Sequence, residues 1–401
     1  MQRIGSAQRM NPIPFSGIRK FVQEAAQLEK AGARILHLEI GRPDFDTPQH
    51  IKDAAKRALD EGHVHYTSNY GIPELREAIA EKLSRENNIV ADPAAEIIVT
   101  VGTNEAIAVT MLALIDPGDQ VLIPDPAWLH YFYCVQLAGG IPVHVPLRAE
   151  NAFQLDPSDL RRAITPKTKM IVVNSPHNPT GAVLGQPVLA EIAQIASENN
   201  LLILSDEIYE KILYDGVKHF SIASIPGMAE RTITANGFSK TYSMTRWRIG
   251  YVAAKREFTD AMIRVHQYTA TSATSFAQFG ALAACRGAQD CVRDMVKEFD
   301  RRRQFLTQAL AKMDGLECVN PQGAFYAFPS IKRLNVSSDA LALYLLRQAG
   351  VAVVPGSAFG EFGAGFLRLA YSNTYENIVE AVERMSIALR QIPADLRETL
   401  A

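Results

Sequence analysis

The stretch Asn-Gly-Phe-Ser-Lys-Thr-Tyr-Ser-Met-Thr-Arg-Trp-Arg-Ile-Gly-Tyr, residues 236–251, is the most specific segment of this chain. It follows residues 231–235, an apolar run that predicts a strand. Lys240 falls in the turn after that strand, where a lysine has no obvious packing role. Ser239 and Arg248 supply hydroxyl and guanidinium donors suited to a phosphate. The alternative, a solvated surface loop, explains this density of donors less well.

Apolar runs of strand length alternate with helical patterns from residue 97 onward. The seven strand candidates are 97–101, 120–123, 141–145, 170–173, 201–204, 231–235 and 249–253. Strand–helix alternation of this kind predicts an α/β fold, in which helices cover both faces of a mainly parallel seven-stranded sheet.

The alternation stops near Cys285, and a different pattern follows. The expected elements are a long helix at 292–313, short strands at 325–328, 351–353 and 366–370, and a terminal helix at 375–391. They predict a smaller α+β domain. We expect residues 48–288 to form the large domain. The small domain then comprises 289–401 and the N-terminal segment 1–47, whose irregular start precedes a helix at 17–30 and a strand at 35–39.

Composition narrows the function classes. The chain has 401 residues, 47% of them hydrophobic and 21% charged, as in ordinary soluble domains. A formal net charge of −2 gives no reason to expect nucleic acid or an anionic membrane as a partner. The four cysteines match no zinc or redox spacing, and no metal site is expected. No apolar run has the length of a signal peptide or a membrane span, so a cytoplasmic protein is expected.

Polar residues follow several predicted strands, at the sheet edge where open parallel sheets bind ligands. Gly102, Thr103 and Asn104 lie where a strand ends and a helix begins, which is a natural anion site. Asn178, in the segment 174–181, offers an amide at another strand end. Each motif has an ordinary alternative: a helix cap and turn for the first, and a proline–glycine turn for the second.

Asp206 and Tyr209 follow the strand at 201–204. A carboxylate after four apolar residues is costly to bury unless a cation meets it. Both side chains can reach one ligand if a helical turn follows the strand. A capping aspartate above a core tyrosine is the alternative.

In this order, the motifs resemble the class I/II aminotransferases, the fold-type-I pyridoxal-phosphate (PLP) enzymes typified by aspartate aminotransferase. The resemblance rests on Gly41–Pro48, Tyr66 with Gly71–Arg76, Gly102-Thr103-Asn104, Asn178-Pro179-Thr180-Gly181, Asp206-x-x-Tyr209, Ser239-Lys240, Arg248, and Arg368 in Phe-Leu-Arg-Leu-Ala-Tyr-Ser. It covers nearly the whole chain. It implies a PLP-dependent aminotransferase that passes the amino group of an L-amino acid to a 2-oxo acid. A PLP lyase acting by β-elimination, a PLP oxidase or decarboxylase, and a non-catalytic effector-binding domain stay open.

The resemblance also implies the role of each cofactor-binding residue. Lys240 is the Schiff-base lysine and moves a proton between the substrate Cα and the cofactor, Asp206 pairs with the pyridine nitrogen, and Tyr209 and Asn178 bind the phenolic oxygen. Trp128 stacks on the ring, unless it is a core tryptophan. The phosphate is expected to bind Gly102, Thr103, Asn104, Ser239 and Arg248.

For the substrate, the resemblance implies a carboxylate clamp by Arg368, with the Gly41 backbone facing the same carboxylate. Trp128 and Asn178 are expected to contact the substrate as well, and Phe15 and Ile18 to close its pocket. Tyr66 is expected to reach the phosphate of a neighbouring subunit, which makes the active unit a homodimer. The family pattern also predicts cis peptide bonds before Pro126 and Pro179. This sequence differs from the pattern at Arg246 and His177, and the roles of these two residues stay open.

Overall fold

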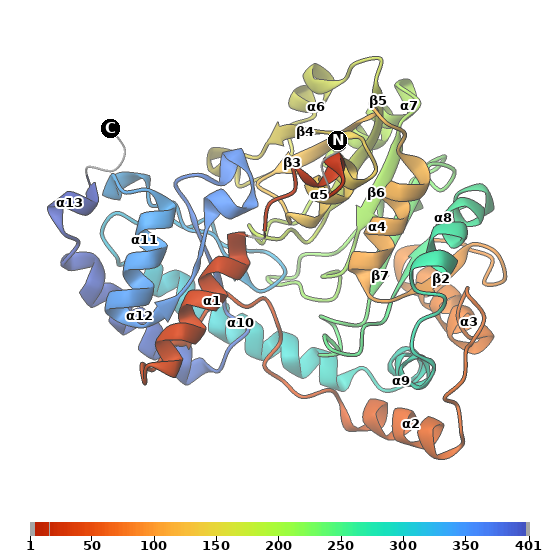
Figure 1. Cartoon of the computed structure of the whole chain (residues 1–401), viewed down its shortest axis with the longest axis horizontal. Coiled ribbons are helices and arrows are strands. Elements are labelled where there is room, and N and C mark those ends of the chain that lie inside the picture. The colour runs from red at the N-terminus through yellow and green to blue at the C-terminus, as the bar shows by residue number, and fades with distance from the viewer. Residues whose placement is uncertain (1–4, 16, 398–401) are drawn as a thin grey trace.

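The computed structural model describes residues 5–15 and 17–397, and its largest unit is a seven-stranded sheet (Figure 1). In spatial order the strands are β2 (Ile97–Thr100), β8 (Gly250–Ala253), β7 (Thr232–Gly237), β6 (Leu202–Asp206), β5 (Thr168–Asn174), β3 (Gln120–Asp125) and β4 (Ile141–Pro146). Only β8 runs antiparallel to its neighbours. The predicted α/β fold with a mainly parallel sheet is therefore confirmed.

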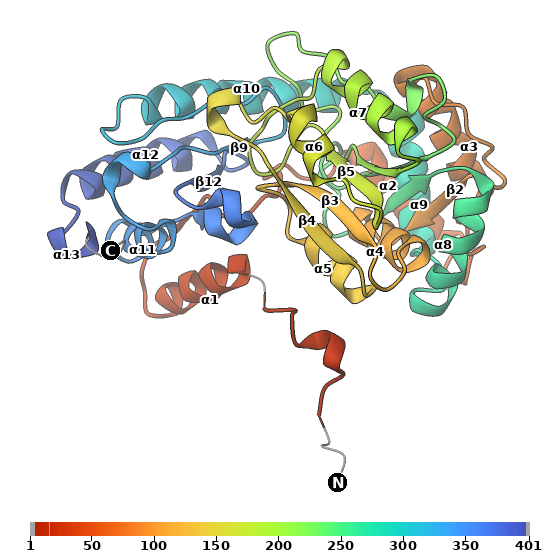
Figure 2. The same ribbon diagram turned by 90° about the horizontal axis from the view of Figure 1, so that it is seen from above.

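Helices cover both faces of this sheet, because its central strands are apolar on both sides. One face packs against α6 (Pro157–Ala163) and α7 (Gln186–Glu198). The other packs against α4 (Thr103–Leu114), α5 (His130–Leu137) and α8 (Arg256–Thr269), as Figure 2 shows. A further core joins β2 and β8 to α2 (Gln49–Asp60), α3 (Pro73–Lys82) and α9 (Ser275–Arg286).

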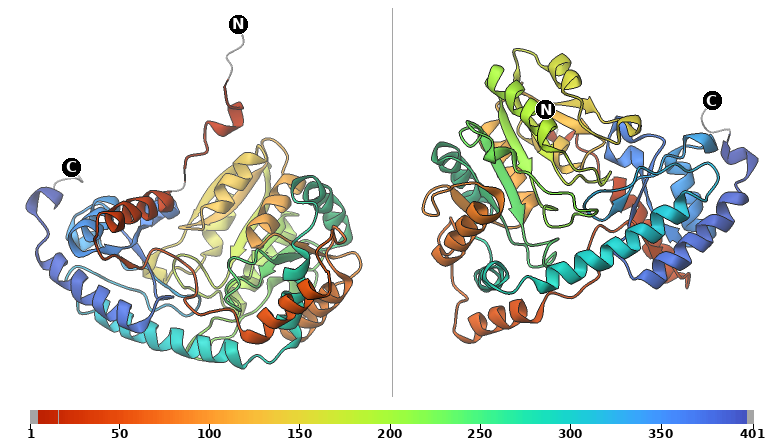
Figure 3. Two further views of the ribbon diagram at one scale, coloured as in Figure 1. Left: turned by 60° about the horizontal axis from the view of Figure 1, so that its bottom comes forward. Right: turned by 180° about the vertical axis from the view of Figure 1, so that it is seen from behind.

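A second group of elements surrounds two small sheets. β1 (Leu36–His37) pairs in parallel with β10 (Val351–Ala352), and β11 (Val354–Pro355), β12 (Leu367–Ala370) and β9 (Tyr326–Ala327) form an antiparallel sheet. The helices of this group are α1 (Gly17–Lys30), α11 (Ser338–Tyr344), α12 (Tyr375–Arg390) and α13 (Ala394–Arg397). The long α10 (Asp290–Leu310) extends from the large sheet's side into this group (Figure 3).

All seven predicted strands of the large sheet are present, and the differences lie at element ends. β6 continues to Asp206, because its residues pair with β5 and β7 up to that point. β1 is only two residues long, since its partner β10 offers two. A 3₁₀ turn at Gln8–Met10 interrupts the N-terminal segment that was expected to be irregular. Within the described ranges, no helix is long and apolar enough to cross a bilayer.

Candidate active site

A cavity of about 320 Å³ lies at the carboxyl ends of β5, β6 and β7, beside the start of α4. Segments from the second group of elements, including α1, β9 and β12, complete its wall. Twelve of the predicted site residues line it: Ile18, Gly41, Thr103, Asn104, Trp128, Asn178, Asp206, Tyr209, Ser239, Lys240, Arg248 and Arg368. Residues far apart in the sequence thus meet in one place.

Three predicted residues lie outside this lining. Gly102 sits directly behind it, against the Arg248 guanidinium. Phe15 and Tyr66 are 93% and 88% exposed in the single chain. Tyr66 was assigned to the site of a neighbouring subunit and Phe15 to pocket closure, and both assignments stay predictions.

Lys240 is held in the turn after β7, with its side chain directed into the cavity. Its Nζ donates a hydrogen bond to the Gly41 carbonyl at 2.6 Å. Burial, together with the positive charges of Arg368 and Arg248, lowers the pKa of Lys240 to about 8. A substantial fraction of this amine is therefore neutral near physiological pH.

Asp206 ends β6 and is 4% exposed. It accepts hydrogen bonds from the Tyr131 hydroxyl at 2.6 Å and from the Ile208 N–H at 3.1 Å. Burial raises the pKa of Asp206 to about 6. Among the described residues, no cation forms a salt bridge with it, and the charge of Lys240 acts only to lower its pKa slightly against the effect of burial.

Arg368 lies on β12 and is 2% exposed. Its Nη atoms donate to Asn178 Oδ1 at 3.3 Å and to the Glu39 carbonyl, while its Nε has no partner in the described part of the chain. The guanidinium stacks over the Tyr326 ring, 4.6 Å from the ring centroid. A buried guanidinium with spare donor capacity suits a carboxylate.

The start of α4 and Arg248 form the opposite end of the cavity. Helix geometry leaves the N–H groups of Thr103 and Asn104 without helical partners. Gly102 has φ +81°, and a Cβ at this position would collide with the Arg248 guanidinium. Arg248 is itself anchored by the Thr245 and Val101 carbonyls. The glycine backbone at position 102, the free N–H groups of Thr103 and Asn104, and the Arg248 guanidinium together form a cradle suited to a phosphate.

Among the lining residues that sequence reasoning missed, three have side chains that bond to predicted site residues. Tyr131 and Tyr326 look like core aromatics in the sequence, yet they contact Asp206 and Tyr209. Asn174 bonds the Asp206 carbonyl and the Asn178 N–H, both at 3.0 Å. Tyr131 lies three residues after Trp128, and Asn174 is the first residue of the motif that contains Asn178. Their positions next to predicted site residues could therefore have indicated Tyr131 and Asn174.

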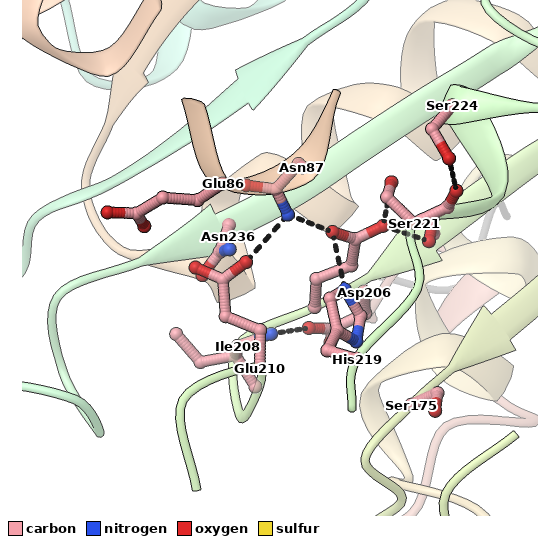
Figure 4. Close-up of polar contacts among 12 residues, drawn as sticks. Glu86, Asn87, Ser175, Asp206, Ile208, Glu210, His219, Ser221, Ser224 and Asn236 are labelled. Atoms are coloured by element: carbon pink, nitrogen blue, oxygen red, sulfur yellow. Dashed lines mark hydrogen bonds and ion pairs between the residues drawn. The ribbon is translucent and has the colours of Figure 1, made fainter. Parts of the chain in front are cut away.

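A buried polar network surrounds the turn after Asp206 (Figure 4). Glu207 accepts hydrogen bonds from Ser205, Ser221, Asn87 and His219. Glu210 accepts hydrogen bonds from Lys82 and Asn87. Burial acts to raise the pKa of Glu210, but the interactions with Lys82 and His219 outweigh burial and lower that pKa to about 2. The ligand atoms of Glu207, Glu210 and His219 lie within 4.8 Å of one another, but Lys82, Asn87 and two serines already bond the carboxylates, so we describe the cluster as a hydrogen-bonded network.

The two departures from the family pattern lie apart from the cavity lining. Arg246 is exposed. His177 is buried, its Nδ1 is 2.8 Å from the Thr180 hydroxyl, and burial lowers its pKa to about 3. The bonds before Pro126 and Pro179 are cis, as predicted, and so is the bond before Pro176.

Comparison with known proteins identifies the family. The model of the aminotransferase class I and II family matches residues 33–385. The chain belongs to this family. Its members are PLP-dependent aminotransferases, so the predicted family and enzyme class are confirmed.

Individual relatives in the family match almost end to end. The chain is 49% identical to an aspartate aminotransferase of Pyrococcus abyssi over 96% of this chain and 98% of that protein. It is 46% identical to an aromatic-amino-acid aminotransferase of Thermococcus litoralis, with the same coverage of both. The solved aspartate aminotransferase of Thermus thermophilus with maleate is 41% identical and superposes with a TM-score of 0.92, over 96% of this chain and all of that one (100%).

Proposed function

We propose that this cavity binds PLP and transfers an amino group from an L-amino acid to a 2-oxo acid. The observation that carries the proposal is the placement of Lys240 and Asp206 in one cavity. Lys240 is a desolvated lysine with a pKa of about 8, and Asp206 is a buried carboxylate with no salt-bridge partner in the described part of the chain.

The residues present fit PLP. The cradle formed by Gly102, Thr103, Asn104, Ser239 and Arg248 would hold the phosphate. Asp206 would meet the protonated pyridine nitrogen, which supplies the cation that this carboxylate lacks. Tyr209 and Asn178 would donate to the phenolic oxygen, and Trp128 would lie against the ring. When bound, PLP supplies an electron sink for the electrons left by a departing Cα proton.

Lys240 has two tasks in this proposal: holding the cofactor and moving the Cα proton. A lysine with a pKa of about 8 exchanges protons readily near neutral pH. Arg368 would bind the substrate carboxylate and orient the Cα–H bond toward Lys240. The charge of Arg368 helps to lower the pKa of Lys240, so a bound carboxylate offsets this effect and makes Lys240 a better proton acceptor.

The proposal includes a homodimer in which Tyr66 reaches the neighbouring subunit's phosphate site. Its exposure of 88%, on a large aromatic side chain, supports a contact outside the single chain. We also propose the division into residues 48–288 and the pair 1–47 with 289–401. The β1–β10 pairing and the start of α10 at Asp290 support this boundary. Four free thiols support a reducing, cytoplasmic location.

The substrate class is proposed from the cavity wall near Arg368. Ile18, Val22 and Ile40 line it, so an amino acid with a large apolar side chain would bury that side chain there. The relatives are named for aspartate and for aromatic amino acids, and this aliphatic wall favours the aromatic class.

The test is a half-reaction. PLP-loaded protein is mixed with single amino acids without an acceptor, and the visible absorption of the cofactor is recorded. We expect the absorption to fade with one equivalent of 2-oxo acid released, and to return when a 2-oxo acid is added. Lys240→Ala abolishes the exchange, whereas Lys211→Ala, at an exposed surface ion pair, retains it. Catalytic release of ammonia without an acceptor would instead identify a lyase, and no response to any amino acid would sink the proposal.

A further inference from the structure

Two buried tyrosine hydroxyls meet at the edge of the cavity. The Tyr209 and Tyr326 oxygens are 2.7 Å apart, and the two side chains are 3% and 1% exposed. We propose that Tyr326 is a positioning residue that donates a hydrogen bond to Tyr209 and thereby strengthens Tyr209 as a donor to the cofactor's phenolic oxygen. The inference rests on the proposed function.

The surroundings hold the Tyr326 hydroxyl in this position. Its ring lies under the Arg368 guanidinium, and edge-to-face contact with the Tyr209 ring places the centroids 5.7 Å apart. Any side chain at position 41 would collide with the Tyr326 hydroxyl, so Gly41 leaves the room that this hydroxyl occupies. The hydroxyl therefore has a defined place between the cofactor-binding and carboxylate-binding parts of the cavity.

Counting protons gives the direction of the hydrogen bond. Each phenol carries one proton. If Tyr209 gives its proton to the phenolic oxygen of the cofactor, the bond between the two tyrosines must be donated by Tyr326. A hydroxyl that accepts a hydrogen bond is polarised and becomes a stronger donor. A stronger donor at the phenolic oxygen draws electron density from the linked Lys240 nitrogen and lowers that nitrogen's affinity for a proton.

The charged and titratable groups around the pair are Lys240, Arg368, Asp206, Arg248, Tyr131 and Glu39. Tyr326→Phe removes one hydroxyl and leaves all of these groups in place, including the ring beneath Arg368. Tyr214→Phe is the matched control, because it removes a buried hydroxyl bonded to the Ala324 carbonyl in the same core, outside the cavity lining.

The experiment is a spectrophotometric pH titration of the PLP-loaded protein, which reports the proton at the Lys240 nitrogen. In Tyr326→Phe we expect this nitrogen to bind its proton roughly threefold more tightly, a rise of about half a pH unit in the titration midpoint, since part of one hydrogen bond is lost. Tyr214→Phe keeps the wild-type midpoint. An unchanged midpoint in Tyr326→Phe overturns the inference. A lower midpoint also overturns it, because Tyr326 would then have been competing for the Tyr209 proton.

A second variant tests whether Tyr326 acts through Tyr209. Tyr209→Phe removes the donor itself, so adding Tyr326→Phe to it should cause no further shift. An equal shift in both backgrounds would show that Tyr326 acts independently and would refute the positioning role. If PLP does not bind at all, the proposed function fails; if PLP binds and the shifts are absent, only this inference fails.

Discussion

Tyr131→Phe is the most informative single change for the cofactor-binding end of the cavity. The Tyr131 hydroxyl donates to Asp206 at 2.6 Å, and both side chains are almost fully buried. Burial raises the pKa of Asp206 to about 6, whereas the Tyr131 hydrogen bond acts to lower it. Without that bond the carboxylate becomes still harder to ionise.

The magnitude follows from the type of bond. A hydrogen bond to a charged group contributes about 1.5–3 kcal/mol, and water entering from the cavity offsets part of the loss. Taking the lower end, the pKa of Asp206 rises by about one unit, because one unit corresponds to about 1.4 kcal/mol. Since a raised carboxylate pKa favours the neutral form, about half of Asp206 is protonated near pH 7 in the variant, whereas in the wild type, with a pKa of about 6, Asp206 is mostly ionised.

The assay is PLP affinity as a function of pH, measured by absorption. We expect Tyr131→Phe to bind PLP about twofold more weakly near pH 7 and up to about tenfold more weakly below the wild-type pKa of about 6, with no deficit at high pH, where Asp206 ionises in both proteins. Tyr133→Phe, a partly buried tyrosine of the same helix α5, is the control and keeps the wild-type affinity. Equal PLP affinity of Tyr131→Phe and wild type across this pH range would refute the role assigned to the hydrogen bond.

Three further outcomes follow from other contacts. Arg368→Lys replaces a bidentate donor by a point charge, so it should raise the KM for amino acids roughly 10- to 100-fold and leave the absorption spectrum of bound PLP unchanged. A changed spectrum in this variant would indicate a role of Arg368 beyond substrate binding. Gly102→Ala strains a positive φ and collides with the Arg248 guanidinium, so it should weaken PLP far more than pyridoxal, which lacks the phosphate. The hydrogen bond to Glu39 raises the pKa of His37 from 6.5 to about 9. The protonated His37 therefore stabilises the fold fully below pH 6.5, and this stabilisation is lost as pH rises to about 9. The free energies of unfolding of His37→Asn and wild type, measured with denaturant, should differ most at low pH and converge above pH 9.

The large sheet was predictable because its central strands carry continuous apolar runs that are buried on both faces, as at residues 170–173 of β5. The clustering of Asp206, Asn178 and Lys240 was predictable for a related reason, since parallel strands bring their carboxyl ends to one edge. Tyr326 could not be placed in the same way. It belongs to a two-residue strand, β9, which pairs with β12, and β12 also carries the Arg368 that lies over the Tyr326 ring.

The turn after β6 serves both the cavity and the buried polar network. In the sequence Asp206-Glu207-Ile208-Tyr209-Glu210, the first, third and fourth residues line the cavity, and both glutamates belong to the network. The glutamates bond to Asn87, Lys82 and His219, so each has hydrogen-bond partners within the protein. Hydrogen bonds from the buried network therefore hold the turn that brings Asp206 and Tyr209 to the cavity, where Asp206 has no salt-bridge partner among the described residues.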